Sequence, residues 1–190
     1  MGQDIGPYGG VFKATEGLAD LFGSNRVRNT PLCESAIVGA SLGWSIAGGK
    51  AMMEMQFSDF VTTGFNQIVN NLAKLHWRWG QAVDVVVRMP TGAGVAAGPF
   101  HSQSTEAWFT HVPGLKVVYP AFPGEAKGLL MASFNEPNPV LFFEHKAMYR
   151  TVREEVKEGP QFIELGKADV VHSGTDLTVI TYGMGIHWTL

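Results

Sequence analysis

The chain has 190 residues, of which 45% are apolar and 16% are charged, and its 14 basic and 17 acidic residues give a net charge of −3. This composition excludes a disordered chain and supports a sizeable core, and the absence of a basic excess argues against nucleic-acid binding. Because the charged fraction is below the roughly 25% of an average soluble domain, we expect other chains to cover part of the surface.

The chain carries no sign of secretion or of membrane insertion. Its single cysteine, Cys33, cannot form an internal disulfide, which favours a reducing compartment. No apolar run reaches the ~20 residues of a membrane span. The first residues, Met1 to Gly6, match neither a signal peptide nor a transit peptide.

Helical and strand patterns alternate along the chain. The predicted helices cover residues 11–22, 34–47, 65–77, 104–111 and 124–134, and the predicted strands cover 51–57, 83–87, 115–119 and 140–143. The apolar run at 83–87 is typical of a strand buried on both faces. The alternation predicts an α/β fold, a parallel β-sheet with helices on both faces. Such sheets bind ligands at the carboxyl ends of their strands.

The composition changes after residue 150. Residues 151–166 are rich in charge and contain Gly159-Pro160, which predicts a linker. Residues 167–190 contain a β-rich run at 176–182 and the beginning of a helix at 186–190. We interpret 1–150 as the main domain, and the loop-like start and unfinished end predict a fragment of a longer protein.

Glu34 is the first candidate for chemistry. It follows Pro31 at the expected start of a helix, among Leu32, Cys33, Ala36 and other apolar residues. Burial would favour a neutral carboxyl, whereas the helix N-terminus would favour a carboxylate. If burial dominates, the group can hold or donate a proton at neutral pH. The alternative is a solvated glutamate that only stabilises the helix dipole.

His101 is the second candidate. It follows the buried strand and a glycine-rich loop, at the strand end where α/β folds place their chemistry. An imidazole is the usual proton carrier near neutral pH. The alternative is a loop histidine bonded to backbone. The remaining histidines have no metal-type spacing and are assigned structural roles: His76, His111, His145, His172 and His187.

Two other patterns point away from a nicotinamide cofactor and toward a planar ligand. The run from Gly92 to Ala97 resembles a dinucleotide fingerprint, but Pro99 blocks the helix that the fingerprint needs, so we reject this interpretation. Phe57 and Phe60 follow the second predicted strand, directly after Gln56. An aromatic side chain there could stack on a heterocycle, although core packing is the alternative.

Taken together, these segments resemble the beta subunit of the thiamine-diphosphate-dependent first component of 2-oxoacid dehydrogenase complexes. The resemblance covers residues 1 to about 150, and its parts run in the family order. The matching stretches are 9–18 (GGVFKATEGL), 30–39 (TPLCESAIVG), 55–60 (MQFSDF), 65–69 (FNQIV), 101–104 (HSQS), 113–118 (PGLKVV) and 138–146 (NPVLFFEHK).

The resemblance implies a fold, a reaction and roles for particular residues. It implies a transketolase-type pyrimidine-binding domain followed by a transketolase C-terminal domain, of which 167–190 would be the beginning. The reaction would be oxidative decarboxylation of a 2-oxoacid with acyl transfer to lipoamide. Glu34 matches the glutamate that bonds the cofactor's aminopyrimidine, Phe60 the aromatic that packs on that ring, with Gln56 close by, and His101 the histidine near the thiazolium and the substrate.

The resemblance also implies partners and metal ions. Glu136 and Asn138 match a region where some members bind K⁺. The family holds the diphosphate and Mg²⁺ with a Gly-Asp-Gly sequence and a distant Asn, and this chain has no Gly-Asp-Gly. The diphosphate half would therefore come from an alpha subunit or a fused alpha domain, in a homo- or hetero-oligomer. The lipoyl-bearing acyltransferase of the complex would be a further partner, in the bacterial cytoplasm or the mitochondrial matrix.

Two other functions fit the same sheet. One is a non-catalytic nucleotide- or phosphate-binding module, which would need a glycine-rich loop running directly into a helix. The other is an assembly domain that only pairs chains, which explains the composition but not the placement of Glu34, Phe60 and His101 at element ends.

Overall fold

The computed structural model describes residues 1–190 and is built around one six-stranded sheet. All paired strands are parallel, and their order across the sheet is β2-β1-β3-β4-β6-β5. The strands are β1 (Gly2–Gln3), β2 (Asn29–Thr30), β3 (Ala51–Glu54), β4 (Val85–Thr91), β5 (Lys116–Val118) and β6 (Val140–His145). The predicted parallel α/β fold is therefore confirmed.

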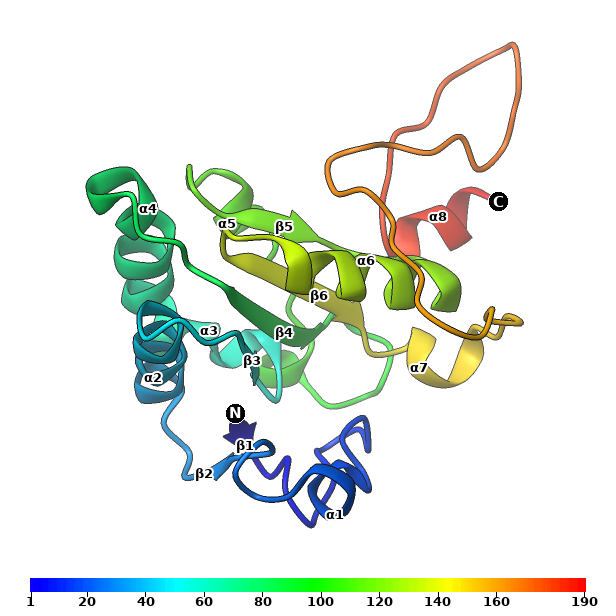
Figure 1. The fold of residues 1–190 in the computed structure, drawn as a ribbon. Helices are drawn as coiled ribbons and strands as arrows, with labels where there is room; N and C mark the ends of the chain where they lie inside the picture. The colour runs from blue at the N-terminus through cyan, green and yellow to red at the C-terminus, as the bar shows by residue number, and fades with distance from the viewer.

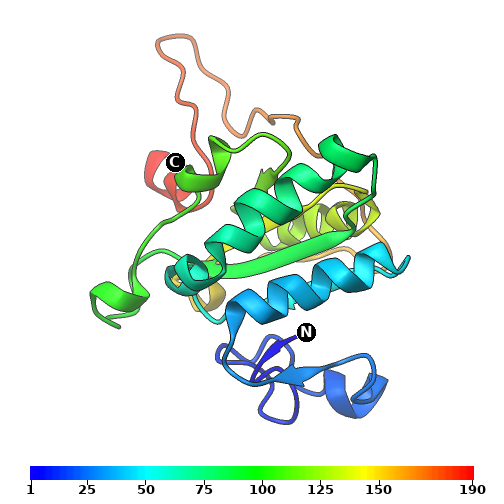
Figure 2. The ribbon, with the colours of Figure 1, turned by 90° about the vertical axis from the view of Figure 1, so that its left-hand side faces the viewer.

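Helices cover both faces of the sheet (Figures 1 and 2). One face carries α2 (Glu34–Ile46) and a continuous helical segment made of α3 (Val61–Asn66), the π-helical η2 (Gln67–Leu72) and α4 (Ala73–Trp79). The opposite face carries α6 (Pro123–Asn135). None of the helices is both long and apolar enough to cross a membrane.

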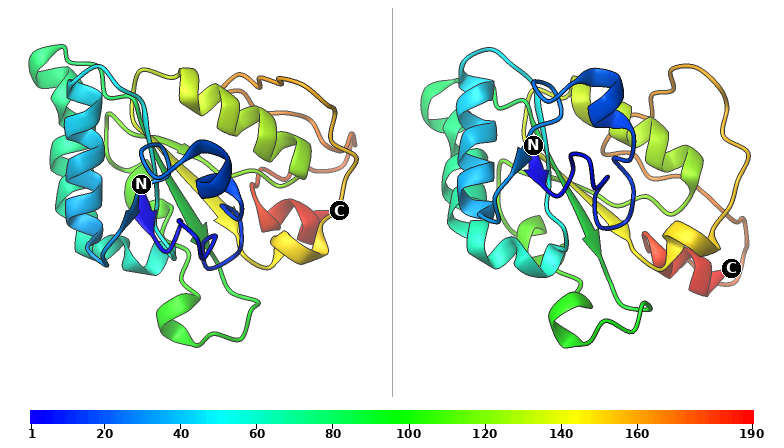
Figure 3. Two further views of the ribbon diagram at one scale, coloured as in Figure 1. Left: turned by 60° about the horizontal axis from the view of Figure 1, so that its bottom comes forward. Right: turned by 90° about the horizontal axis from the view of Figure 1, so that it is seen from below.

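Shorter helices lie in the connections and at the chain ends. They are α1 (Leu18–Phe22), the 3₁₀ turns η1 (Ser58–Phe60) and η3 (Pro99–His101), α5 (Ala107–Thr110), α7 (Met148–Thr151) and α8 (Met184–Thr189). The loop that carries η3 extends beyond the sheet, as the views from below show (Figure 3).

The alternation of side chains along β4 divides the core into two layers. Val85, Val87 and Met89 point to the face covered by α2 and α4, where they join the larger cluster of buried residues. Val86 points to the α6 face and packs with Val140 and Phe142. Because both faces of β4 are covered, all its residues are buried, as the apolar run predicts.

Several predicted elements differ from those in the structure. The helix expected at 11–22 is confined to Leu18–Phe22, after a series of turns. The β-rich run at 176–182 forms no strand, because an isolated strand has no neighbour to satisfy its backbone groups. Residues 152–183 contain neither helix nor strand and run outside the layers as an extended loop (Figure 1). The strands β1 and β2, with two residues each, had no detectable pattern.

Candidate active site at the carboxyl edge of the sheet

The candidate residues come from segments that follow three strands of the sheet, β2, β3 and β4, of which β3 and β4 are neighbours. Glu34 begins α2 shortly after β2, Phe60 lies in η1 after β3, and His101 lies in η3 after β4. Because parallel strands all end at the same edge, these three segments meet at the carboxyl edge of the sheet. The topology therefore brings together residues that are far apart in the sequence.

Glu34 is buried rather than solvated. Only 9% of the residue is exposed, and the Thr63 hydroxyl donates a hydrogen bond to its Oε2 atom at 2.9 Å. The same hydroxyl lies 2.8 Å from the carbonyl oxygen of Phe60. Oε1 receives no hydrogen bond within the chain. Thr63 thus links the Glu34 carboxyl directly to the turn that carries Phe60.

Phe60 and His101 are in direct contact. Their ring centroids are 5.5 Å apart, in an edge-to-face arrangement. Phe57 packs against both rings, 5.5 Å from Phe60 and 4.8 Å from His101, and also against Phe12 of the N-terminal loop at 5.4 Å. The imidazole of His101 is therefore held by aromatic rings and not by a hydrogen bond to backbone.

Gln56 is directed to a different neighbour. Its amide nitrogen donates to Oδ2 of Asp4 at 2.8 Å, which links the end of β3 to the N-terminal loop. The structure therefore joins Glu34, Phe60 and His101 through Thr63 and Phe57. The Gln56 amide is instead hydrogen-bonded to Asp4.

Glu136 and Asn138 lie next to each other, far along the chain from this site. The Asn138 amide donates to Oε1 of Glu136, and the Lys116 ammonium pairs with Oε2 at 2.6 Å. Burial alone would raise the pKa of Glu136, but these hydrogen bonds outweigh burial and lower it. A potassium ion needs several free oxygen ligands, and in this arrangement an ammonium group already occupies the carboxylate, so the pair fits that ion poorly.

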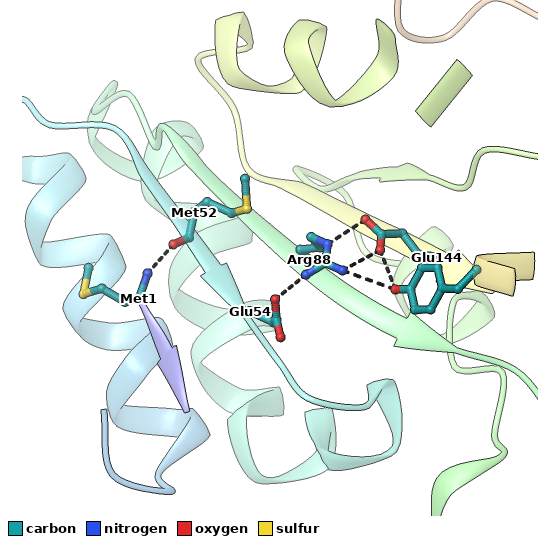
Figure 4. Close-up of polar contacts among 6 residues, drawn as sticks. Met1, Met52, Glu54, Arg88 and Glu144 are labelled. Carbon is teal, nitrogen blue, oxygen red and sulfur yellow. Dashed lines mark hydrogen bonds and ion pairs between the residues drawn. The ribbon is translucent and has the colours of Figure 1, made fainter. Parts of the chain in front are cut away.

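A buried ion cluster lies on the α6 side of the sheet (Figure 4). Arg88 in β4 forms ion pairs with Glu54 in β3 and with Glu144 in β6, the latter at 2.7 Å, and Tyr149 bonds the same carboxylate. Burial would lower the pKa of Arg88, but the Glu144 carboxylate, then Tyr149 and Glu54, outweigh burial and raise it. The N-terminal ammonium of Met1 donates to the Met52 carbonyl nearby.

A second group of buried polar residues, Asp59 and Lys146, lies next to the candidate site. Asp59 is 6% exposed and Lys146, which follows β6, is 2% exposed. Burial lowers the pKa of Lys146, and the negative charge of Asp59 partly opposes that shift. The Lys146 ammonium also lies 5.4 Å from the centre of the Phe57 ring.

Sequence patterns did not identify Thr63, Asp59 or Arg88 as important. A single threonine in a helix carries no signal, because its role depends on which helix packs beside it. Arg88 did have a signal, since a charge inside the run Val85-Val86-Val87-Arg88-Met89 predicts a buried cation that needs partners.

The candidate site has no metal cluster, and a hollow lies elsewhere in the molecule. No group of three or more His, Cys, Asp or Glu side chains is arranged to hold a metal ion. A hollow of about 680 Å³ lies beside β3 and α2, among Met1, Trp44 and Met52. That hollow contains none of Glu34, Phe60 and His101.

The known proteins that this chain resembles include beta subunits of 2-oxoacid dehydrogenases. The chain is 48% identical over 192 positions to the beta subunit of 2-oxoisovalerate dehydrogenase of Bacillus subtilis, covering 100% of this chain and 59% of that protein. It is 48% identical over 186 positions to the mitochondrial 2-oxoisovalerate dehydrogenase subunit beta 2 of Arabidopsis thaliana, covering 96% and 52%. The beta subunit of the pyruvate dehydrogenase E1 component of Bacillus subtilis is 44% identical over 192 positions, with 100% and 59% covered.

The chain spans between about half and three fifths of the length of these curated relatives. The family description "Transketolase, pyrimidine binding domain" matches residues 1–152. This agrees with the parallel sheet and with the resemblance inferred from the motifs. On these grounds the chain belongs to the transketolase pyrimidine-binding domain family, and the relatives that it matches within that family are beta subunits of 2-oxoacid dehydrogenases.

Proposed function

We propose that this chain forms the pyrimidine-binding half of a thiamine-diphosphate-dependent 2-oxoacid dehydrogenase, as part of its beta subunit. The observation that carries the proposal is the buried Glu34 carboxyl, joined through Thr63 to Phe60 and from there to His101. A carboxyl can bind and protonate an aminopyrimidine, and an aromatic ring can pack on it. An imidazole can donate a proton to a reacting carbonyl compound or accept one from it.

Glu34 holds and moves the proton in this proposal. The Thr63 hydroxyl has one hydrogen but faces two acceptors, the Phe60 carbonyl and Oε2 of Glu34. With that hydrogen given to Oε2, a neutral Glu34 carboxyl carries its own hydrogen on Oε1, which has no other partner in the chain. In this proposal the Oε1–H faces the ring nitrogen of the aminopyrimidine and donates its hydrogen to it.

Phe60 and His101 act beside that carboxyl. The Phe60 ring packs on the aminopyrimidine, and the His101 imidazole donates or positions a proton during decarboxylation and acyl transfer. Gln56 supports the end of β3 next to the cofactor, through its bond to Asp4. Thiamine diphosphate, when bound, supplies the electron sink for the decarboxylation of the 2-oxoacid.

The diphosphate and its Mg²⁺ are held by another chain or domain in this proposal. A diphosphate with Mg²⁺ needs additional oxygen ligands, and the printed sequence has no Gly-Asp-Gly to offer them. We assign that half to an alpha subunit or a fused alpha domain, within a homo- or hetero-oligomer. The lipoyl-bearing acyltransferase of the complex accepts the acyl group.

The relatives guide the finer assignments. Their names include 2-oxoisovalerate and pyruvate dehydrogenases, so we infer a 2-oxoacid substrate of the branched-chain or pyruvate type. Relatives from bacteria and from mitochondria support a place in the bacterial cytoplasm or the mitochondrial matrix. We also infer that 151–166 is a linker and that 167–190 begins a transketolase C-terminal domain. A potassium ion at Glu136 and Asn138 would require Lys116 to leave the carboxylate.

Replacing Glu34 with Gln tests the proposal. In the assembly with its alpha partner, E34Q should lower 2-oxoacid decarboxylation by on the order of 100-fold or more, because the proton is lost while the shape is kept. The measurement is oxoacid-dependent CO₂ release, with circular dichroism as the folding check.

A matched control is Glu125→Gln, because Glu125 also lies in the first turn of a 13-residue helix and its carboxylate accepts a hydrogen bond from the Ala121 N–H. This control should retain activity within a few-fold. Equal activity of E34Q and E125Q would contradict the proposal and favour a nucleotide-binding or assembly domain.

A further inference from the structure

The backbone of Gln103 is held by four groups from two neighbouring strand ends. Its N–H donates to Oδ1 of Asp59 at 2.9 Å. Its carbonyl oxygen accepts from the Gly92 N–H at 2.9 Å and from the Thr91 hydroxyl at 3.2 Å. The Ser58 hydroxyl donates to Thr91 Oγ1 at 2.8 Å and supports that donor. We call Ser58, Asp59, Thr91 and the Gly92 N–H the Gln103 clamp.

The side chains of the clamp are buried, which limits the access of water to their hydrogen bonds. Ser58 and Thr91 are fully buried and Asp59 is 6% exposed. Hydrogen bonds in such surroundings are stronger than at the surface, and chains of them reinforce one another. The side chain of Gln103 itself is exposed, so the clamp holds its peptide groups and not its amide.

The clamp closes the loop that carries His101. The loop leaves β4 at Gly92, whose φ of +82° and close approach to the His145 ring exclude a side chain. It returns at Gln103, and the Gly92–Gln103 hydrogen bond joins its two ends. Because His101 is two residues before Gln103, its position depends on where this end is fixed.

The clamp also ties that loop to Phe60. The turn η1 contributes Ser58 and Asp59 to the clamp and Phe60 to the candidate site. Phe57, immediately before the turn, packs 4.8 Å from the His101 ring. One short turn therefore fixes both the ring that His101 contacts and the backbone that follows His101.

The buried charge of Asp59 has a counterpart at the end of β6. Lys146 is buried and its Nζ has no hydrogen-bond partner in the chain, and neither has Oδ2 of Asp59. The Lys146 backbone N–H is bonded to the Thr91 carbonyl at 3.0 Å, which attaches Lys146 to the strand that supplies Thr91. The opposite charges of the two side chains limit the cost of burying each one.

We propose that Asp59 is a positioning residue, which through the Gln103 clamp holds the His101 imidazole against Phe57 and Phe60. That His101 acts in catalysis rests on the proposed function, whereas its fixed position is a property of the chain itself. Asp59 touches neither substrate nor cofactor in this proposal and acts only through the Gln103 backbone.

The first test measures position without activity. The measurement is an NMR spectrum of the full chain with isotope-labelled histidine. The neighbouring aromatic rings should change the chemical shifts of the His101 ring protons, and the signal that is missing in H101Q is assigned to His101. Asp59→Ala should move that signal toward the value of an exposed histidine and raise amide exchange across 92–103 at least about tenfold. Asp59→Asn keeps an acceptor for the Gln103 N–H and should restore most of the signal.

Two further variants keep the test decisive if D59A fails to fold. Thr91→Val removes a donor to the Gln103 carbonyl without changing a buried charge, and it should shift the His101 signal in the same direction. Ser133→Ala is the matched control, because its hydroxyl is buried and bonds only within α6. A His101 signal that is the same in T91V, in S133A and in the unmodified chain would overturn the proposal.

The second test uses the assembly with its alpha partner. D59A should lower kcat by about 10- to 100-fold, the usual effect of a small misplacement of a reacting group, with a smaller change in KM. D59N should recover most of kcat. A misplaced His101 with unchanged kcat would contradict the role in catalysis. An inactive wild-type assembly would instead contradict the proposed function, while the His101 signal would still decide whether the clamp positions the ring.

Discussion

At the scale of single residues, the site depends on one hydroxyl group. Thr63 lies 2.9 Å from the Glu34 carboxyl and 2.8 Å from the Phe60 carbonyl, so it sets the distance between the acid and the aromatic residue. A side chain of the same shape without the hydroxyl would leave the Glu34 carboxyl in a buried position without a partner.

Replacing Thr63 with Val should therefore impair the site while leaving the fold intact. We expect T63V to cost about 1–3 kcal/mol of unfolding free energy, because the buried carboxyl loses its partner, and to lower the decarboxylation rate about tenfold or more. Urea unfolding and CO₂ release by the assembly provide the measurements. Thr63→Ser retains the hydroxyl and should stay within a few-fold of the unmodified chain, so equal losses in T63S and T63V would contradict this role.

At this scale, the sequence named candidate residues from local patterns that can be read without the fold. His101 was identified because it follows a strand end, where parallel sheets bind ligands. Glu34 was identified as a carboxyl at a helix start among apolar residues, and the strand β2 before it was not predicted. Thr63 and Asp59 were given no role, because their importance comes from neighbours that are distant in the sequence.

At the scale of elements, the central strands are joined by charge as well as by backbone hydrogen bonds. Arg88 in β4 is paired with carboxylates of β3 and β6, on the side of the sheet that faces α6. The side chains of Arg88, Glu54 and Glu144 are only 7%, 5% and 14% exposed. A cation in this position neutralises two acids that would otherwise repel each other across the sheet.

Replacing Arg88 with Met should destabilise the sheet strongly. Removing one partner of a buried ion pair leaves uncompensated charge, and the expected loss is about 3–5 kcal/mol of unfolding free energy. The measurement is urea unfolding followed by circular dichroism. Lys50→Met is the control, because the Lys50–Asp84 pair at 3.5 Å is far more exposed and should cost about 1 kcal/mol or less. Similar losses in R88M and K50M would show that the cluster contributes little.

The predictable elements are those with a long enough repeat. The 13-residue helices α2 and α6 and the buried strands β4 and β6 have clear apolar patterns. The two-residue strands β1 and β2 have none, and they exist only because a neighbouring strand offers hydrogen-bond partners. For the converse reason, the β-rich run at 176–182 remains without a partner and forms no strand.

At the scale of the whole molecule, the candidate site lies at the carboxyl edge of the sheet, apart from the hollow beside β3 and α2. The chain provides a carboxyl, an aromatic ring and an imidazole, but no group of acidic side chains for a metal ion. In the proposed function, these groups serve the aminopyrimidine half of the cofactor, and another chain or domain holds the diphosphate half.

The chain by itself should therefore not decarboxylate a 2-oxoacid. We expect CO₂ release only after the alpha partner is added, together with thiamine diphosphate and Mg²⁺, because the diphosphate half of the cofactor is then held. Titrating the partner against this chain and following CO₂ release and complex size provides the measurement. Turnover by the isolated chain at the rate of the assembly would contradict a shared site.

The sequence by itself determined the α/β class, the family, the helix start at Glu34 and the strand end before His101, because these depend on local patterns and on the order of elements. Only the tertiary structure decided that Thr63 joins Glu34 to Phe60, that Asp59 and Thr91 hold the Gln103 backbone, and that Arg88 is enclosed between two carboxylates. Apart from the Thr63–Phe60 hydrogen bond within one helical turn, these contacts join residues separated by 12 to 56 positions. Such residues meet only when helices and strands pack against one another.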